Sequence, residues 1–192
     1  MKKIIFASKN KGKVREVEHI LKDLNVHITS LEDINESIDI EETGSTFEEN
    51  AKIKAKQVYD KFRIPTIADD SGLVVEQLNG APGIYSSRYA GENGNDAANN
   101  KKLLNELRKF PEPHKAKFVC AAVYYDGKKF YTATGEMKGK IIHDKRGSNG
   151  FGYDPLFIPD GYNVTSAELP PEVKNSISHR FKAFEKLKEM IS

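Results

Sequence analysis

The stretch ADDSGL at residues 68–73 directly follows an apolar segment and places two adjacent acids, Asp69 and Asp70, at the end of a predicted buried strand. A carboxylate in that position needs a cation. A hard divalent ion such as Mg²⁺ takes oxygen ligands and commonly reaches a protein through one or two carboxylates plus substrate phosphates. The pattern therefore favours phosphate chemistry. The structural alternative is that Asp69 and Ser71 cap a turn that Gly72 opens.

The composition is that of a globular protein with one domain. The chain has 192 residues, of which 38% are hydrophobic and 30% charged, so it can bury a substantial core and does not resemble a disordered chain. The net charge of +2 is too small to create an overall electrostatic attraction to nucleic acid or membranes. Cys120 is the single cysteine, which excludes an internal disulfide and a multi-cysteine zinc site. No signal peptide or bilayer-spanning run is apparent, so we expect a cytoplasmic protein without a membrane or a stable nucleic-acid complex.

The segment SKNKGK at residues 8–13 is a candidate phosphate-binding loop. It lies between a strand-like segment and apolar residues at helical spacing. Unpaired N–H groups and the dipole at a helix N-terminus favour an anion, and Lys9, Lys11 and Lys13 add positive charge. The spacing of a Walker A loop is absent. The alternative is a solvated lysine-rich turn.

A second acidic pair, Glu41 and Glu42, precedes the TFEE segment at residues 46–49. That segment is a capping box at the start of a predicted helix, which carries Lys54 further along. The cap uses Glu49, whereas Glu41 and Glu42 have no such role and are candidate metal ligands. The alternative is a solvated acidic loop.

Between these motifs and the C-terminus, the pattern predicts a short strand at 73–75, an irregular loop at 81–91 and a helix from about 97 to 109. Strands at about 117–125 and 128–134 follow. Asp126-Gly127 joins them as a hairpin, which makes the sheet mixed.

A glycine-dense loop at residues 146–155 presents Phe151, Tyr153 and Asp154. Its glycines let the backbone approach a ligand closely, and aromatic faces can stack on a nucleobase. It is not the dinucleotide-binding fingerprint, because no G-x-G-x-x-G follows a strand. Packing of Phe151 in the core is the alternative.

The segment KNSISHR at residues 174–180 stands at the start of the predicted C-terminal helix. Lys174 and Arg180 offer donors to a purine 6-oxo group, which adenine replaces with an amino donor. A site built on that hydrogen bond would reject adenine. By itself, His179 is more typical of a capping or surface histidine.

Six motifs in one order, from residue 4 to about residue 190, resemble the inosine/xanthosine triphosphate pyrophosphatase family. They are SKNKGK at 8–13, EETGSTFEENA at 41–51, ADDSGL at 68–73, GAPGIYS at 80–86, GFGYDP at 150–155 and SHR at 178–180. The resemblance implies an α/β fold with an elongated mixed β-sheet flanked by helices. It also implies a single domain over residues 1–192, with two lobes and a central substrate cleft, usually as a homodimer.

The activity that the resemblance implies is Mg²⁺-dependent hydrolysis of dITP, ITP, XTP and dXTP to the monophosphate and pyrophosphate. Such an enzyme clears deaminated purines from the nucleotide pool before they enter DNA or RNA. The resemblance assigns metal to Asp70 and the Glu41-Glu42 pair, slightly favours Glu41 within that pair, and makes Asp70 the general base. The expected substrate-binding residues are Ser8, Lys9, Asn10, Lys11, Gly12, Lys13, Lys54, Ser71, Phe151, Gly152, Tyr153, Asp154, Lys174, His179 and Arg180.

Two residues of the first loop depart from the family pattern. Ser8 stands where many relatives have threonine, and Lys9 stands where many have glycine. The hydroxyl is retained. The additional charge of Lys9 could change the affinity for a triphosphate.

The expected mechanism follows from charge. Mg²⁺ bridges triphosphate oxygens and lowers the pKa of a nearby water, and Asp70 orients or deprotonates that water. Attack at the α-phosphorus then releases pyrophosphate in one step, while lysines stabilise charge on the outer phosphates.

Two other functions stay open. One is a related pyrophosphatase acting on pyrimidine or methylated nucleotides. The other is a non-catalytic module that binds nucleotides or single-stranded nucleic acid, which the three acids disfavour because they would oppose phosphates without a metal.

Overall fold

The computed structural model describes residues 2–34 and 38–192, and the chain divides into two compact units. Unit 1 consists of Met1–Asp70, Cys120–Gly135 and His179–Ser192. Unit 2 consists of Ser71–Val119 and Glu136–Ser178. Each unit has its own hydrophobic core and is described separately.

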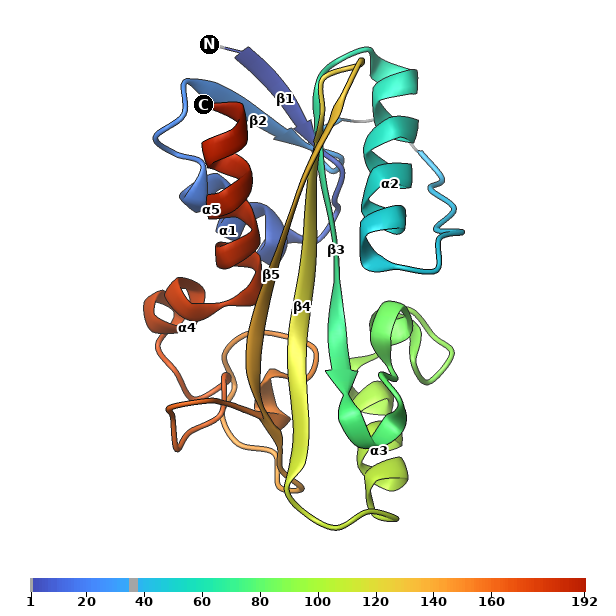
Figure 1. The fold of residues 1–192 in the computed structure, drawn as a ribbon, viewed down its shortest axis with the longest axis vertical. Helices are drawn as coiled ribbons and strands as arrows, with labels where there is room; N and C mark the ends of the chain where they lie inside the picture. Colours follow the sequence, from blue (N-terminus) through green and yellow to red (C-terminus); the bar gives the residue numbers. More distant parts are fainter. Residues whose placement is uncertain (1, 35–37) are drawn as a thin grey trace. The chain divides into compact units, whose positions relative to one another are not determined.

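The strands form one six-stranded sheet in the order β2-β1-β3-β4-β5-β6 (Figure 1). β1 is parallel to β2 and β3, whereas β6 is antiparallel to β5. The loop at residues 126–129 is too short for a parallel crossover, so β4 and β5 are antiparallel. The expected α/β fold with a mixed sheet is confirmed. The strands are β1 (Lys2–Phe6), β2 (Val26–Ser30), β3 (Thr66–Val75), β4 (His114–Tyr125), β5 (Phe130–Ile141) and β6 (Phe157–Pro159).

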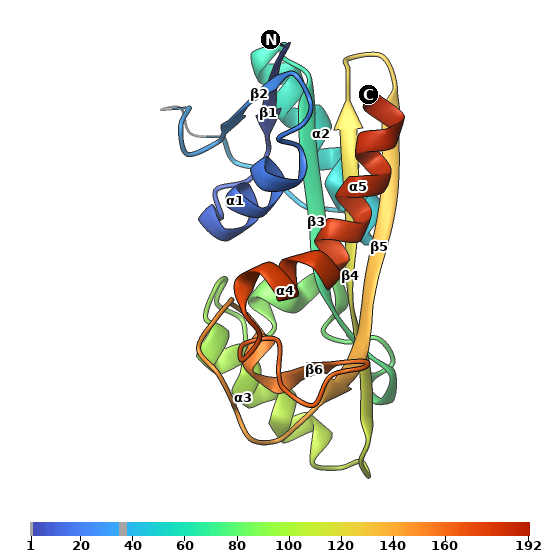
Figure 2. The same cartoon turned by 90° about the vertical axis from the view of Figure 1, so that its left-hand side faces the viewer.

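Unit 1 has helices on both faces of its part of the sheet: α1 (Lys11–Ile20) and α5 (His179–Ile191) on one face, and α2 (Phe47–Phe62) on the other (Figures 1 and 2). Successive side chains of a strand point to opposite faces of the sheet, so each strand contributes residues to the cores on both faces. Ile4 and Phe6 of β1 pack in the cluster that contains α1 and α5 residues, whereas Ile5 packs in the cluster of α2.

Unit 2 packs α3 (Asp96–Leu107) against the ends of β3, β4 and β5. Its core contains Leu73 from β3 and Leu103 from α3, and the ring of Phe118 meets that of Phe157 edge-on with centroids 4.7 Å apart. The remaining elements are α4 (Pro171–Ile177) and the 3-10 helices Glu76–Leu78, Gly83–Arg88 and Asp154–Leu156.

Two of the predicted helix starts, those of α1 and α2, are confirmed. The side chain of Asn10 accepts a hydrogen bond from the N–H of Lys13 and caps α1. The side chain of Thr46 accepts a hydrogen bond from the N–H of Glu49 and caps α2. The loop at residues 8–13 therefore lies at a helix N-terminus, as its sequence predicts. No helix within the described residues is long and apolar enough to cross a membrane.

Three expected boundaries are wrong. β3 does not end at Asp69 and Asp70 but continues as a ten-residue strand to Val75, because each acid pairs with a lysine that is largely buried. The turn considered at Gly72 is therefore absent from this strand. β5 extends to Ile141 rather than 134. The C-terminal segment forms two helices, α4 and α5, which meet at Ser178.

We expect Phe184→Ala to lower the free energy of unfolding by about 3–5 kcal/mol, because it removes a large side chain from a packed core. Phe184 of α5 is fully buried, and its ring meets that of Phe6 edge-on. Urea unfolding at neutral pH measures the change. Met190→Ala on the exposed side of the same helix is the control and should change the free energy by less than about 0.5 kcal/mol. Equal effects of the two substitutions would contradict this packing.

Candidate active site

Two adjacent carboxylates of β3 face opposite layers of unit 1. Successive side chains of a strand point to opposite faces of the sheet. Asp69 meets residues of α1 and α5, and Asp70 meets residues of α2. Although the two acids are neighbours in the chain, they belong to different ionic clusters.

Asp69 lies in a buried cluster whose charges balance. Its carboxylate is 3.0 Å from Lys13 Nζ and 3.3 Å from Arg180 Nε, and Arg180 also pairs with Glu16 at 2.6 Å. Burial alone would raise the pKa of Asp69, but Lys13, Arg180 and Lys54 outweigh it and hold that pKa below the ordinary value. Asp69 and Glu16 carry two negative charges, and Lys13 and Arg180 carry two positive charges. The net charge of these four side chains is therefore zero. Asp69 is therefore ionised and structurally engaged.

Cys120 shares this cluster, with its sulfur 3.9 Å from Asp69 Oδ2. Burial and the neighbouring carboxylate raise the pKa of the Cys120 thiol. It stays protonated at neutral pH, so its environment does not suit a nucleophile.

Asp70 lies in a second cluster, with Lys54 and Glu42. Lys54 Nζ is 3.1 Å from Asp70 Oδ1 and 3.2 Å from Glu42 Oε1, so one ammonium serves two carboxylates. Burial raises the pKa of Asp70 and Glu42 adds to this, while Lys54 and Lys13 oppose it. Burial alone would lower the pKa of Lys54, but its acidic neighbours keep it raised. These three side chains carry a net charge of −1.

Asn50 ties the acidic loop to Asp70. Its Oδ1 accepts from the N–H of Gly44 at 2.8 Å, which leaves Nδ2 to donate to Asp70 Oδ2 at 3.3 Å. A Cβ at Gly44 would lie 2.7 Å from Asn50 Oδ1, so a side chain there would displace this contact. The loop that carries Glu42 is therefore held beside Asp70 by a buried amide.

The two acids of the predicted metal-binding pair are placed differently. Glu42 shares Lys54 with Asp70, whereas Glu41 is exposed. Among the described residues, Glu41, Glu42 and Asp70 do not bring three ligand atoms within 4.8 Å of one another. The oxygen donors of Glu42 and Asp70 nevertheless suit a hard cation, since they already share an ammonium.

In the first loop, three of the predicted phosphate-binding residues, Ser8, Asn10 and Lys11, form contacts within the protein. Ser8 Oγ accepts from the N–H of Asn10 at 3.2 Å, and Lys11 pairs with Glu32 at the surface. Lys9 is exposed. Gly12 is the second residue of α1, and Lys13 is bound to Asp69 through its ammonium.

Unit 2 holds the predicted residues of the glycine-dense loop and Lys174. Lys174 Nζ is 3.0 Å from Asp154 Oδ2 and 5.1 Å from the ring centroid of Phe151. The same carboxylate oxygen accepts from the N–H of Phe151 at 3.0 Å. Phe151 is 37% exposed, so the alternative that it packs in the core is wrong. Tyr153 instead packs in the core of unit 2, and its hydroxyl donates to the carbonyl of Ser86.

The remaining predicted residues are also placed. Gly152 is fixed to α3, because its N–H donates to Asp96 and its carbonyl accepts from Asn100. Ser71 follows Asp70 on β3 and is half-buried. His179 is the buried first residue of α5.

Sequence reasoning missed the ionic role of Glu16 and Asp69. The available signal was weak: Lys13 and Glu16 are three residues apart on a predicted helix, so both reach the same face. That signal does not identify a partner on a strand far along the chain.

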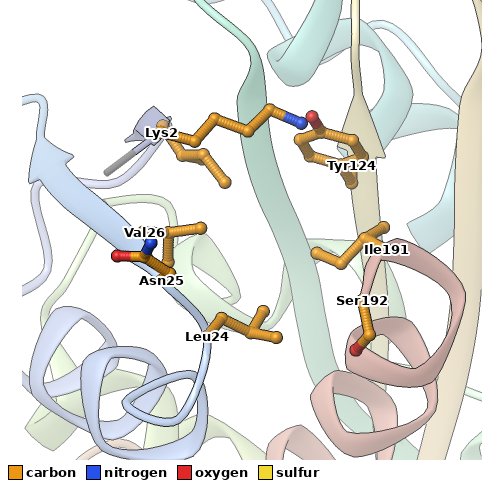
Figure 3. Close-up of a pocket in the computed structure, with 8 residues that line it drawn as sticks. Lys2, Leu24, Asn25, Val26, Tyr124, Ile191 and Ser192 are labelled. Atoms are coloured by element: carbon orange, nitrogen blue, oxygen red, sulfur yellow. The ribbon is translucent and has the colours of Figure 1, made fainter.

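A separate cavity of about 210 Å³ lies in unit 1 near both chain ends (Figure 3). Tyr124 and Ile191 point into it, together with the side chain of Lys2. None of the predicted site residues lines it. The ionic clusters of β3 are therefore the stronger candidate site.

Known proteins resemble this chain over almost its whole length. A family model described as the Ham1 family matches residues 4–190. The chain is 49% identical to a dITP/XTP pyrophosphatase of Oceanobacillus iheyensis, over 100% of this chain and 98% of the relative. It is also 49% identical to a dITP/XTP pyrophosphatase of Geobacter sulfurreducens, over 98% of this chain and 96% of that protein. The solved structure of a HAM1 protein from Coxiella burnetii is similar with a TM-score of 0.91 and 40% identity, covering 100% and 98% of the two chains.

We expect Asp69→Asn to lower the free energy of unfolding by about 3–5 kcal/mol at pH 7, since it removes the buried carboxylate between Lys13 and Arg180 and leaves Arg180 with Glu16 alone. The folded protein holds the pKa of Asp69 low, so the unfolded chain takes up protons first as the pH falls. The difference in the free energy of unfolding between wild type and variant should thus be constant above about pH 5 and shrink below about pH 4.

Urea unfolding across this pH range measures the difference. The control is Asp60→Asn, whose carboxylate pairs with Lys56 at the surface of α2. It should cost less than about 1 kcal/mol. A wild-type advantage over Asp69→Asn that persists undiminished at pH 3 would refute the low pKa.

Proposed function

This chain belongs to the Ham1 family, and from that premise we propose that it hydrolyses dITP, ITP, XTP and dXTP to the monophosphate and pyrophosphate. Relatives named dITP/XTP pyrophosphatase, 49% identical over almost the whole chain, support this substrate class. The observation that carries the proposal is the Asp70–Lys54–Glu42 cluster. Its three side chains carry excess negative charge on hard oxygen donors, and Lys13 of α1 is close enough to oppose the rise in the pKa of Asp70.

The cofactor that fits this cluster is Mg²⁺, held by Asp70 and Glu42. Two carboxylates with substrate phosphates and water form a common magnesium site. We prefer Glu42 to Glu41 because Glu42 already shares a cation with Asp70. When bound, the ion would neutralise phosphate charge and lower the pKa of a ligated water.

Asp70 is the proposed general base. A positioned carboxylate can accept a proton from water, and burial and Glu42 raise the pKa of Asp70 in the metal-free protein. The amide of Asn50 fixes the orientation of its Oδ2. The carboxylate can therefore orient or deprotonate the water that attacks the α-phosphorus, with pyrophosphate as the leaving group.

The triphosphate would bind at the N-terminus of α1. The unpaired N–H groups of the first turn and the helix dipole favour an anion there. Lys9 and Lys11 are exposed beside this turn. Their charges, with those of Lys13 and Lys54, would stabilise the outer phosphates, which is the main electrostatic demand of phosphoryl transfer.

For the base, Lys174 is the better of the two proposed donors to a 6-oxo group. Asp154 holds its ammonium beside the exposed ring of Phe151, on which a purine could stack. Arg180 donates instead to Asp69 and Glu16. We propose that Arg180 acts by holding Asp69 in position. His179 and Ser71 keep their proposed substrate contacts.

Assembly as a homodimer and a location in the cytoplasm stay predictions. Light scattering coupled to size exclusion decides the first. A molar mass of a single chain would exclude the dimer.

We expect Asp70→Asn to reduce kcat for dITP by at least about 100-fold, because an amide cannot accept the proton of the attacking water. The fold should survive, since Lys54 keeps Glu42 as its partner. A pyrophosphate-release assay measures turnover and circular dichroism checks the fold. Asp60→Asn on α2 is the matched control and should keep wild-type activity. Near-normal turnover by Asp70→Asn would refute the assignment of the base.

A panel of nucleotides tests the substrate class. We expect pyrophosphate, and no orthophosphate, from dITP, ITP and XTP with Mg²⁺, and little product from dATP or dTTP, because adenine and thymine do not offer a purine 6-oxo acceptor. Removal of Mg²⁺ by a chelator should abolish turnover. Preference for a pyrimidine or a methylated nucleotide would establish the first alternative function. Salt-dependent oligonucleotide binding without hydrolysis would establish the second.

A further inference from the structure

Unit 2 contains a cluster of two histidines and one glutamate that the proposed hydrolysis does not use. Glu112 lies in the loop before β4, His114 is the first residue of β4, and His143 follows the end of β5. His114 Nε2 is 3.0 Å from His143 Nε2, which is 3.5 Å from Glu112 Oε1. One ligand atom from each residue lies within 4.8 Å of the other two.

The hydrogen bonds of Gln77 fix the tautomer of His114, that is, which ring nitrogen carries the hydrogen. The Gln77 Nε2 donates to the carbonyl of Pro111 at 2.8 Å, so its Oε1 faces His114 Nδ1 at 2.6 Å. An amide oxygen can only accept, and therefore Nδ1 carries the hydrogen. In the neutral ring this leaves a lone pair on Nε2, the atom that faces the cluster. His114 is fully buried, so its orientation is set by packing as well.

The centre of the cluster has two hydrogen-bond acceptors, His114 Nε2 and a carboxylate oxygen of Glu112, but at most one hydrogen to share between them. His143 Nε2 can carry one hydrogen, yet it faces both the lone pair of His114 and a carboxylate oxygen of Glu112. A cation at the centre would satisfy all three ligand atoms together. Ligands about 2.0–2.2 Å from a tetrahedral ion lie roughly 3.3 Å apart, close to the two separations observed.

We propose that Glu112, His114 and His143 bind a divalent transition metal ion of the Zn²⁺ class, oriented by Gln77. Two imidazoles and one carboxylate suit zinc and its neighbours rather than Mg²⁺, which prefers oxygen ligands. An acceptor on the far nitrogen of a histidine is the usual support of such a ligand. Glu112 and His143 are 67% and 36% exposed, which leaves an entry path and room for a water as fourth ligand.

A metal here would join the start of β4 to the end of β5, and through Gln77 to the 3-10 helix that follows β3. Its role is therefore structural. Because the ion binds the folded state, it would raise the unfolding temperature of the protein by mass action.

The test is a calorimetric titration of the full-length, chelator-treated protein with Zn²⁺ in excess Mg²⁺, which occupies sites built from oxygen ligands. We expect a single Zn²⁺ per chain and a higher unfolding temperature. His143→Ala should bind at least about tenfold more weakly, as should Glu112→Gln. His27→Ala, which removes an exposed histidine of β2, should bind as the wild type does. Co²⁺ in place of Zn²⁺ should give the absorption of a tetrahedral site, and His143→Ala should lose it.

Gln77 supplies an independent check. Gln77→Glu keeps an acceptor for the Nδ1 hydrogen of His114 and should retain binding, whereas Gln77→Met should weaken it about 10–100-fold. Circular dichroism of each metal-free variant controls for folding. The proposal is overturned if the wild type takes up no Zn²⁺ in excess Mg²⁺, or if His143→Ala binds it as tightly as His27→Ala. Hydrolysis of dITP is read separately, so failure here leaves the proposed activity standing.

Discussion

The pleat of β3 is the constraint on which the candidate site depends. Because Asp69 and Asp70 are consecutive, they must face opposite layers of helices. On one face, Lys13 and Arg180 neutralise Asp69 and join α1 and α5 to the strand. On the other face, Asp70 shares Lys54 with a second acid. One carboxylate is thereby committed to structure, while its neighbour keeps a charge imbalance that a ligand can resolve.

This asymmetry explains how a charged strand can pass through the core. A buried carboxylate without a partner costs several kcal/mol, and an ion pair largely cancels that cost without adding much stability. The balanced cluster of Asp69 therefore accounts for the continuation of β3. The cluster of Asp70 is less completely compensated, as the raised pKa of this acid indicates. Functional groups are typically held in such incompletely satisfied surroundings.

Local signals in the sequence predicted the elements of the site but not their pairing. The capping box at Thr46 and the helical spacing that follows the loop at residues 8–13 indicated two helix starts, and both are confirmed. The end of β3 was misplaced because adjacent acids normally interrupt a strand, and the cations that permit them come from distant segments. Likewise, no spacing rule indicated that Arg180 would meet Asp69, 111 residues earlier in the chain. Contacts of this kind depend on tertiary packing.

The histidine cluster shows how misplaced strand boundaries hide a site. The N–H of Asp126 donates to the carbonyl of Lys129, and an unbroken register counted from this turn sets His114 opposite Ile141. His143 is two residues further and would project to the same face. The predicted strand ended at about residue 134, just before Gly135, a residue type that weakens strands. Here the glycine serves close packing instead, since a Cβ at residue 135 would lie 2.2 Å from a backbone oxygen of α5. Had the second strand been extended through that glycine and the first strand begun at His114, the hairpin register would have brought the two histidines together from sequence.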